Sequence, residues 1–187
     1  MAFLRQALAA ARLLLVMTVL LGIGYPLVVT AAAQTMPSQA NGSLIVADGT
    51  VVGSSLIGQS FTGPQWFWSR PSSSDYAGTT SGGSNLSPGS SAQQQAGAER
   101  EKALIAANPN AVGPVPEDAL TASASGLDPH ISVAYALWQV PRVAQARGID
   151  PAVLDSLIEA STDRAPLGYL GQDGVNVVRL NLALERQ

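Results

Sequence analysis

The sequence predicts an α+β protein in which one N-terminal transmembrane helix precedes a single extracytoplasmic domain. Residues 13–47 contain no charged residue. The rest of the chain is polar, rich in Gly, Ser and Pro, and about one domain in size. In that part, two short β-rich runs precede several stretches in which apolar residues recur at helical spacing.

Charge and cysteine content exclude several classes of function. The chain has ten Lys plus Arg and thirteen Asp plus Glu, and only Lys102 is a lysine. Such a domain lacks the clustered cations that bind a nucleic-acid backbone, so we expect no nucleic-acid partner. The absence of cysteine excludes disulfides, thiolate nucleophiles and cysteine-ligated metals.

The uncharged run 13–33 is long enough to cross a bilayer, which takes about 20 apolar residues. Arg5 and Arg12 precede it, and no basic residue follows before Arg70. The positive-inside rule then predicts cytoplasmic residues 1–12, a transmembrane helix 13–33 and an extracytoplasmic, periplasmic domain 34–187.

A cleaved secretory signal is the alternative reading of this run. Ala31 and Ala33 fit a small-residue cleavage site, and the mature chain would then begin at Gln34. The run is longer than the roughly 7–15 apolar residues of a signal peptide, which favours an anchor that is retained. In either case the main domain faces outward.

Short strands and a long irregular segment open the domain. Ser43–Ala47 and Thr50–Gly53 are β-rich, and Asp48-Gly49 between them is a hairpin signal. Residues 56–61 are expected to continue the strand system. Residues 61–91 are mostly turn-forming, but their large aromatic side chains need burial, so we expect an ordered irregular segment folded over the core: Trp66, Phe67, Trp68 and Tyr76.

Helix signals follow. Residues 91–107 are helix-prone with a thin apolar face, and Asn108-Pro109 ends them. Asp128 is predicted to be an N-cap with Pro129 at the first helical position, and Asp150-Pro151 repeats the pattern. Pro141 is expected to kink or split the first of these helices, which Gly148 closes. The last segment fits two readings, because apolar residues from Val178 to Leu184 alternate as in a strand but Val177, Leu180 and Leu184 are also spaced as in a helix. We interpret it as a short strand at Val175 and then a helix, with Asn176 available as its N-cap.

Asp128 and His130 are the residues that most resemble a catalytic pair, because His130 is the only histidine. A serine hydrolase needs serine, histidine and acid together, and the chain has no G-x-S-x-G motif. A metal site needs several converging ligands, and this pair supplies two at most. We therefore predict no catalytic residue and no metal. Asp128 and His130, at a helix start, and Trp68, in the irregular segment, are predicted to be structural or interface residues.

Two further stretches are weak candidates for an anion or cofactor. The glycine-rich run has backbone N–H groups suited to an anion-binding nest but lacks the lysine of a phosphate loop: Ser81, Gly82, Gly83, Ser84 and Asn85. Arg70 lies among aromatic residues. It is expected either to stack on Trp66 or Trp68, or to meet an anion or a partner's carboxylate.

Several stretches together resemble the C subunit of the bacterial potassium-transporting P-type ATPase. The stretches are "SLIGQSF", "FWSRPS", "YAGTTSGGSNLSP", "VPEDALTASASGLDPHIS", "RVAQARG" and "GVNVVRLNLAL", and the resemblance covers the chain from the N-terminal anchor to the end. The resemblance implies a non-catalytic accessory subunit in the inner membrane. Its partners would be a pore-like potassium-binding subunit, an ATP-hydrolysing subunit and the lipid bilayer.

The resemblance also implies a catalytic-chaperone role that raises the ATP affinity of the hydrolysing subunit. No intrinsic cofactor is expected, and ATP is implied by the resemblance alone. The charge bias places residues 34–187 opposite cytoplasmic ATP, so a nucleotide site there requires the reverse topology or the isolated protein. A secreted or anchored binding module, with residues 61–91 as its binding face, and an independent hydrolase that depends on His130 are the competing hypotheses.

Overall fold

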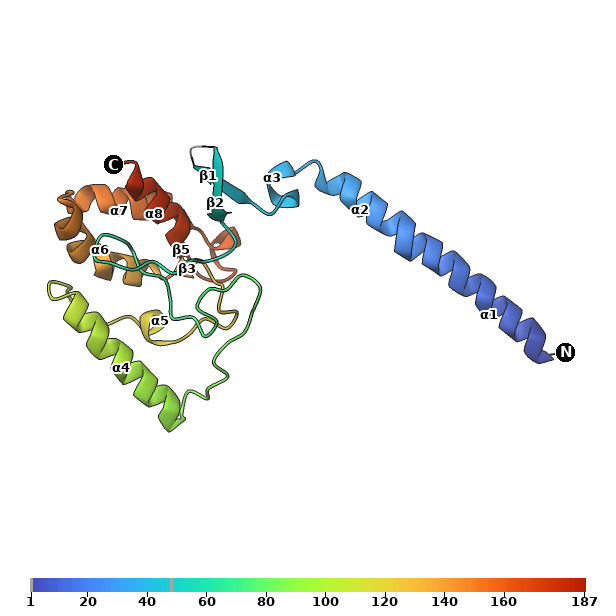
Figure 1. Ribbon diagram of the computed structural model, residues 1–187, viewed down its shortest axis with the longest axis horizontal. Coiled ribbons are helices and arrows are strands. Elements are labelled where there is room, and N and C mark those ends of the chain that lie inside the picture. Colours follow the sequence, from blue (N-terminus) through green and yellow to red (C-terminus); the bar gives the residue numbers. More distant parts are fainter. Residues whose placement is uncertain (1, 48) are drawn as a thin grey trace. The chain divides into compact units, whose positions relative to one another are not determined.

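The computed structural model describes residues 2–47 and 49–187 and divides the chain into two units, residues 1–44 and residues 45–187 (Figure 1). The first unit is almost entirely helical. The second combines short strands with helices around one hydrophobic core. This confirms the predicted α+β class with one N-terminal apolar helix.

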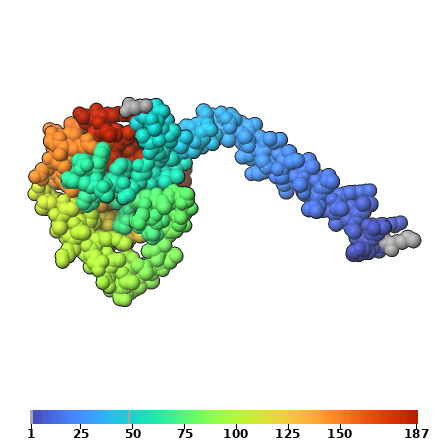
Figure 2. All heavy atoms as spheres, in the orientation of Figure 1, coloured from blue at the N-terminus to red at the C-terminus, as the bar shows by residue number. Residues whose placement is uncertain are grey.

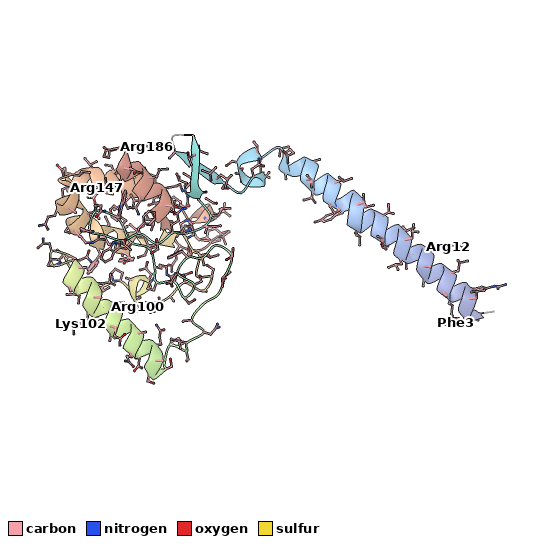
Figure 3. All side chains as sticks on the ribbon, viewed as in Figure 1. Phe3, Arg12, Arg100, Lys102, Arg147 and Arg186 are labelled. Carbon is pink, nitrogen blue, oxygen red and sulfur yellow. The ribbon has the colours of Figure 1, made fainter. Side chains whose placement is uncertain are left out.

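The first unit is dominated by one helix of 32 residues, Ala2–Ala33, which is long and apolar enough to cross a membrane. It consists of α1 (Ala2–Val19), a π-helical turn η1 (Leu20–Gly24) and α2 (Tyr25–Ala33). The helix begins well before the uncharged run because Ala, Leu and Arg, which are strong helix formers, fill its first turns. Arg12 lies on this N-terminal part (Figure 3).

The π-helical turn lies next to the only proline of the helix. The backbone N–H of Tyr25 donates to the carbonyl of Leu20, five residues back. In a regular α-helix the ring of Pro26 would clash with the carbonyl of Gly22, and the wider turn avoids that contact. The helix therefore continues through Pro26 without a break. A short helix α3 (Pro37–Ala40) follows it.

The domain opens with the predicted hairpin. Strands β1 (Leu44–Ala47) and β2 (Thr50–Ser54) form a two-stranded sheet. Of the predicted Asp-Gly turn, Asp48 lies outside the described residues, and Gly49 has the positive φ of 77° that favours glycine. The expected continuation over residues 56–61 is wrong, because this stretch forms no strand.

A second, three-stranded antiparallel sheet lies at the centre of the domain. It contains β3 (His130–Ile131), β4 (Thr162–Asp163) and β5 (Gly174–Asn176) in the order β3-β5-β4. His130 is opposite Asn176, and Asp163 is opposite Gly174. The strands are short, but each is directly joined to a helix that packs on the core.

The described part of the domain has five α-helices, of which α6 and α8 contact β5, and α6, α7 and α8 lie close together in Figure 1. They are α4 (Ser91–Ala107), α5 (Glu117–Leu120), α6 (Val133–Arg147), α7 (Pro151–Ala160) and α8 (Val177–Glu185). Only Leu104 of α4 is buried, which confirms its thin apolar face. A 3-10 turn η2 (Pro166–Gly168) lies between β4 and β5.

Most helix boundaries follow the predicted local signals. The carboxylate of Asp150 accepts from the N–H of Ala152 at 2.9 Å, and Asn176 accepts from Arg179 at 3.1 Å. Gly148 ends α6 with φ of 67°. Pro141 does not split α6, which continues as one helix to Arg147.

The segment between β2 and α4 has no regular secondary structure but covers the core, as predicted. Phe67 is fully buried in the hydrophobic cluster, and Phe61, Trp66 and Trp68 pack against it. In Figure 2 this segment, teal to green, lies at the surface of the domain next to the orange and red helices. An irregular chain in this position needs partners for its backbone polar groups, and those partners define the site.

Candidate functional site: the His130 network and the Arg142 clamp

The start of α6 differs from the prediction. Ser132, not Asp128, is the N-cap, and its hydroxyl accepts from the N–H of Tyr135 at 3.0 Å. Asp118 holds the cap in place, because its carboxylate accepts from both the N–H and the hydroxyl of Ser132, at 2.7 and 2.9 Å. Pro129 and His130 therefore lie before the helix rather than in its first turn.

The sheet explains why the Asp-Pro signal fails here. Residues 130 and 131 pair with β5, and the carbonyl of Pro129 accepts from the N–H of Val177 at 2.9 Å. These bonds are made with residues more than forty positions away, and they outweigh the local preference for a helix start. Asp128 instead closes a tight turn, accepting from the N–H of His130 at 3.0 Å.

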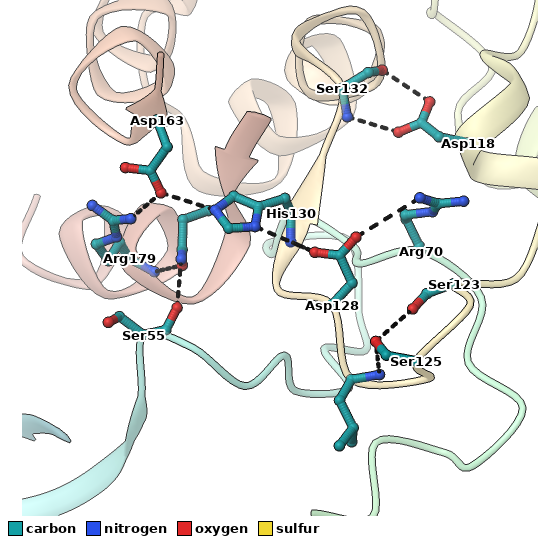
Figure 4. Close-up of polar contacts among 12 residues, drawn as sticks. Ser55, Arg70, Asp118, Ser123, Ser125, Asp128, His130, Ser132, Asp163 and Arg179 are labelled. Atoms are coloured by element: carbon teal, nitrogen blue, oxygen red, sulfur yellow. Dashed lines mark hydrogen bonds and ion pairs between the residues drawn. The ribbon is translucent and has the colours of Figure 1, made fainter. Parts of the chain in front are cut away.

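His130 lies between two carboxylates (Figure 4). Its Nδ1 is 3.2 Å from Oδ1 of Asp128, and its Nε2 is 2.9 Å from Oδ2 of Asp163. Arg179 of α8 forms an ion pair with Asp163, and Nη1 of Arg70 is 3.8 Å from Oδ2 of Asp128. Positive and negative side chains thus alternate along the row, which we call the His130 network: Arg70, Asp128, His130, Asp163 and Arg179.

The network shifts the pKa values of His130, Asp128 and Asp163 in the direction that favours their charged forms. The hydrogen bond to Asp128 is the main cause that raises the pKa of His130, with Asp163 adding to it. Burial is the largest single cause and acts to raise the pKa of Asp128 and of Asp163. The hydrogen bonds to His130, together with the charges of His130 and of the neighbouring arginine, outweigh it and hold each pKa below its usual value. Ionised carboxylates only accept, so both bonds are made when both ring nitrogens carry protons.

This geometry does not suit His130 for hydrolysis. Both ring nitrogens are bonded to carboxylates, which leaves neither to activate a serine hydroxyl. Within residues 2–47 and 49–187, no group of three or more His, Asp or Glu side chains is placed to hold a metal ion. The network is instead a brace that ties the turn before β3 to β4 and α8.

The glycine-rich run packs against the turn that contains Ser123 and Ser125. The N–H of Gly82 donates to the carbonyl of Ser125 at 2.8 Å, and the hydroxyl of Ser81 donates to the same carbonyl at 3.0 Å. A Cβ on Gly83 would lie 3.0 Å from the carbonyl oxygen of Ala124. Close backbone packing thus explains Gly83, whereas a Cβ on Gly82 would meet nothing within 4 Å. At least one N–H of the suggested anion nest, that of Gly82, is already bonded.

The glycine before Asp128 has a related role. Gly126 has φ of 69°, and a Cβ there would lie 2.6 Å from the Ser74 hydroxyl and 2.7 Å from the Gly82 carbonyl. Its own carbonyl accepts from the Ser72 hydroxyl at 2.7 Å. The "TASASG" stretch is therefore the junction at which three parts of irregular backbone meet.

Arg142 holds the aromatic part of the irregular segment. Its guanidinium donates to the carbonyls of Gly63, Pro64 and Trp66, at 3.2, 2.8 and 2.9 Å. It also donates to the side chains of Asn108 and Gln139, both at 2.7 Å. The side chain is buried, and burial lowers the pKa of Arg142 to about 10, so it remains charged at neutral pH.

Trp68 and Phe67 are fixed by the same cluster. The guanidinium carbon of Arg142 lies 4.0 Å from the centre of the Trp68 ring. The N–H of Trp68 donates to Gln139 at 2.7 Å. The buried amide of Asn181 accepts from the Phe67 N–H and donates to the Phe67 carbonyl, both at 2.9 Å. We call this group the Arg142 clamp: Asn108, Gln139, Arg142 and Asn181.

The tryptophans do not stack on the arginine that the sequence suggested. Arg142 and Arg147 lie over Trp68 and Trp66, the latter at 4.4 Å from the ring centre. Arg70 instead reaches the carbonyl and hydroxyl of Thr121, both at 3.4 Å. The stacking prediction for Arg70 is therefore wrong, because Arg142 and Arg147 project from a helix that faces both rings.

The structure brings together only some of the candidate residues. Arg70, Asp128 and His130 share one network, whereas Trp68 belongs to the clamp and Ser84 lines a different cavity from Arg70. Sequence reasoning missed Asp163, Arg179, Asp118 and Arg142. One sequence signal could have pointed to Arg142: its helical spacing with Tyr135 and Trp138 places an arginine on the apolar face of the helix.

The fold and site together define a class of protein: an α+β domain behind one apolar helix, with its polar clusters used to brace backbone. Residues 7–186 match the family described as K+-transporting ATPase, c chain. The chain therefore belongs to that family.

Similar proteins extend over nearly its whole length. A potassium-transporting ATPase KdpC subunit from Sorangium cellulosum is 51% identical over 189 residues, which cover 99% of this chain and 98% of the relative. The KdpC subunit of Serratia proteamaculans is 48% identical with the same coverage. The KdpC subunit of Kineococcus radiotolerans is 49% identical over 183 residues, 97% of this chain and 93% of that protein.

Proposed function

We propose that this chain is a non-catalytic accessory subunit of a potassium-transporting ATPase, which it assembles or stabilises. The observation that carries the proposal is the identity of about half of all residues with KdpC subunits over 99% of the chain. The site supports this proposal, because the side chains of the His130 network and the Arg142 clamp bond to one another and to the backbone of the same domain. The partners are the potassium-binding and ATP-hydrolysing subunits of the complex.

Co-purification tests this proposal. The tagged chain is expressed with the other subunits, extracted in mild detergent and isolated through its tag. The expected result is recovery of both partner subunits and of ATP hydrolysis that potassium stimulates. Recovery of the chain alone, from cells that contain both partners, contradicts the proposal.

The proposed location is the inner membrane, with the N-terminus in the cytoplasm and residues 34–187 outside. The apolar helix Ala2–Ala33 supports an anchor, and Arg5 and Arg12 before its uncharged part support this orientation. Protease added to right-side-out vesicles is expected to cut the domain, and protease added to inverted vesicles is not. Cleavage only in inverted vesicles reverses the topology.

The catalytic-chaperone role, in which the chain raises the ATP affinity of the hydrolysing subunit, is proposed to act through subunit contact. The geometry gives little support to direct ATP binding, since Arg70 and Ser84 line different cavities and Gly82 is bonded to Ser125. The KM for ATP, measured for complexes with and without this chain, tests the role. An unchanged KM contradicts it.

A further inference from the structure

Two arginines of α6 hold the irregular segment, whereas Arg70, which belongs to that segment, makes much weaker contacts. Arg142 makes five hydrogen bonds, and Arg147 bonds to the carbonyls of Gln65 and Leu184. Each also lies over a tryptophan ring. Arg70 has only long contacts, and its buried Nε has no hydrogen-bond partner in the described part of the chain. An unsatisfied buried donor of this kind requires an explanation.

Arg70 lines a cavity of about 440 Å³ between the irregular segment and α4. This volume is within the range of ligand sites, about 300–1,000 Å³. We call it the arginine pocket; its walls include Phe61, Trp68, Arg70, Tyr76, Arg100 and Tyr135. Of the residues that line it in the described ranges, two are cationic and none is acidic.

The two positive charges are poorly compensated. Arg100, on α4 (Figure 3), donates to the carbonyl of Leu120 at 2.7 Å, which carries no full charge. The nearest carboxylate to Arg70 is Asp128, at 3.8 Å, and Asp128 is already bonded by His130 on its other oxygen. Only 25% of the Arg70 side chain is exposed, so water compensates its charge in part.

We propose that the arginine pocket receives a carboxylate side chain from another subunit of the ATPase complex. This inference rests on the proposed function, since it names a contact within the assembly. A carboxylate matches the planar fork of a guanidinium and is carried on an apolar stem that suits aromatic walls. A pairing of this kind fixes the register of the docked partner.

The pocket is less suited to a nucleotide. A triphosphate is bound through many converging backbone N–H groups, usually at a glycine-rich loop that opens a helix. The glycine-rich run of this chain contributes no residue to the pocket walls. Two guanidinium groups on apolar walls suit one carboxylate better than a phosphate chain.

Carbodiimide cross-linking tests the inference, because this reagent joins an amine to a carboxylate in direct contact. Lys102 is the only lysine of the chain. The double variant Lys102→Arg with Arg70→Lys therefore places the one lysine amine in the pocket. In the purified complex, we expect this double variant to form a covalent product with another subunit. The single variant Lys102→Arg, which has no lysine, is expected to form no such product, and any product it does form comes from another amine.

The matched control moves the lysine to an exposed arginine. Arg164 is 63% exposed and paired with Glu159 and Asp173 of its own chain. Lys102→Arg with Arg164→Lys is expected to give no intersubunit product. If the position-70 variant still co-purifies with its partners but gives no such product, or is joined only to Asp128, the inference fails and the proposed function stands. If the unaltered chain does not co-purify, the proposed function itself fails.

Binding of small ligands distinguishes a carboxylate from a phosphate or nucleotide as the occupant of the arginine pocket. The thermal unfolding midpoint of the full chain in detergent is measured with ATP, inorganic phosphate and acetate, for wild type and Arg70→Gln. No midpoint shift that depends on Arg70 is expected with ATP or phosphate. A rise with ATP in the wild type alone identifies the pocket as a nucleotide site and overturns the inference.

Discussion

The Arg142 clamp and the His130 network both use charged side chains to hold irregular backbone, but they do so in opposite surroundings. Arg142 is 6% exposed and is neutralised by carbonyl and amide dipoles. The His130 side chain is 35% exposed and lies between carboxylates that titrate. The contribution of the clamp to the free energy of unfolding is therefore large and nearly independent of pH near neutrality. The contribution of the network is smaller and depends on pH.

The largest expected effect is on the clamp. Arg142→Met keeps much of the side-chain volume but leaves the carbonyls of Gly63, Pro64 and Trp66 without their donor. Because each buried unsatisfied group costs about 1–3 kcal/mol, we expect a loss of about 3 kcal/mol or more in unfolding free energy. Urea unfolding of the full chain in detergent measures it, with Arg164→Met as the exposed control.

An Arg142→Met variant that unfolds at the same urea concentration as Arg164→Met would break the comparison. It would mean that the irregular segment is held by aromatic burial alone. The expected control value is within about 1 kcal/mol of wild type, as for other exposed ion pairs.

The second effect concerns the amide of Asn181, which is changed while the charged Arg142 stays in place. Asn181→Leu removes both bonds to the Phe67 backbone and is expected to cost about 2 kcal/mol. Asn110→Leu is the matched control, because Asn110 is exposed and bonds only to Gln145 in the described residues. Tryptophan fluorescence reports any release of Trp66 or Trp68. Equal costs for the two variants would contradict a specific role for Asn181.

The third effect distinguishes Ser132 from Asp128 as the start of α6. Ser132→Ala removes the cap and the bond to Asp118, at an expected cost of about 1 kcal/mol. Hydrogen exchange at the N–H of Tyr135 should become faster. Asp128→Ala should leave that amide protected while it disturbs the network. Faster exchange at the Tyr135 N–H in Asp128→Ala would instead support Asp128 as the N-cap, as the sequence suggested.

The smallest effect is the pH dependence of the network. A raised pKa means that the folded state binds the His130 proton more tightly, so this stabilisation is complete below about pH 6.5 and is lost as pH rises through the folded pKa. The lowered pKa values of Asp128 and Asp163 give a contribution that is present above about pH 3.8 and lost in acid. The network is therefore strongest between these limits.

The unfolding midpoints of wild type and His130→Gln, compared at pH 5.5 and pH 9, check this sign. The midpoint of His130→Gln should fall further below that of wild type at pH 5.5 than at pH 9. Solvent screening keeps the corresponding difference in unfolding free energy at about 1 kcal/mol or less. A difference that grows toward pH 9 would contradict the assignment of a protonated His130. Arg142→Met gives the contrast, with a cost that is nearly the same at both values.

Local signals predicted those elements whose ends are decided locally. Asp150 and Asn176 cap their helices as expected, because each needs only an N–H two or three residues ahead. Asp128 has the same signal and fails, since β5 competes for the following residues. Arg142 and Arg147, not Arg70, lie over the tryptophans because of the orientation of α6, which no local pattern encodes. Gly83 was conspicuous in the sequence, but its cause is a backbone neighbour, Ala124, more than forty residues away.

The order of the central sheet has a consequence for biosynthesis. The middle strand, β5, is the last of the three to be made, and β3 and β4 pair only with it. Neither sheet nor core is complete until residues 174–185 have emerged, by which time the apolar helix at the other end has long been synthesised. The domain therefore cannot complete its fold before the apolar helix has left the ribosome, so the helix is free to meet its own surroundings while residues 45–187 are still unfolded.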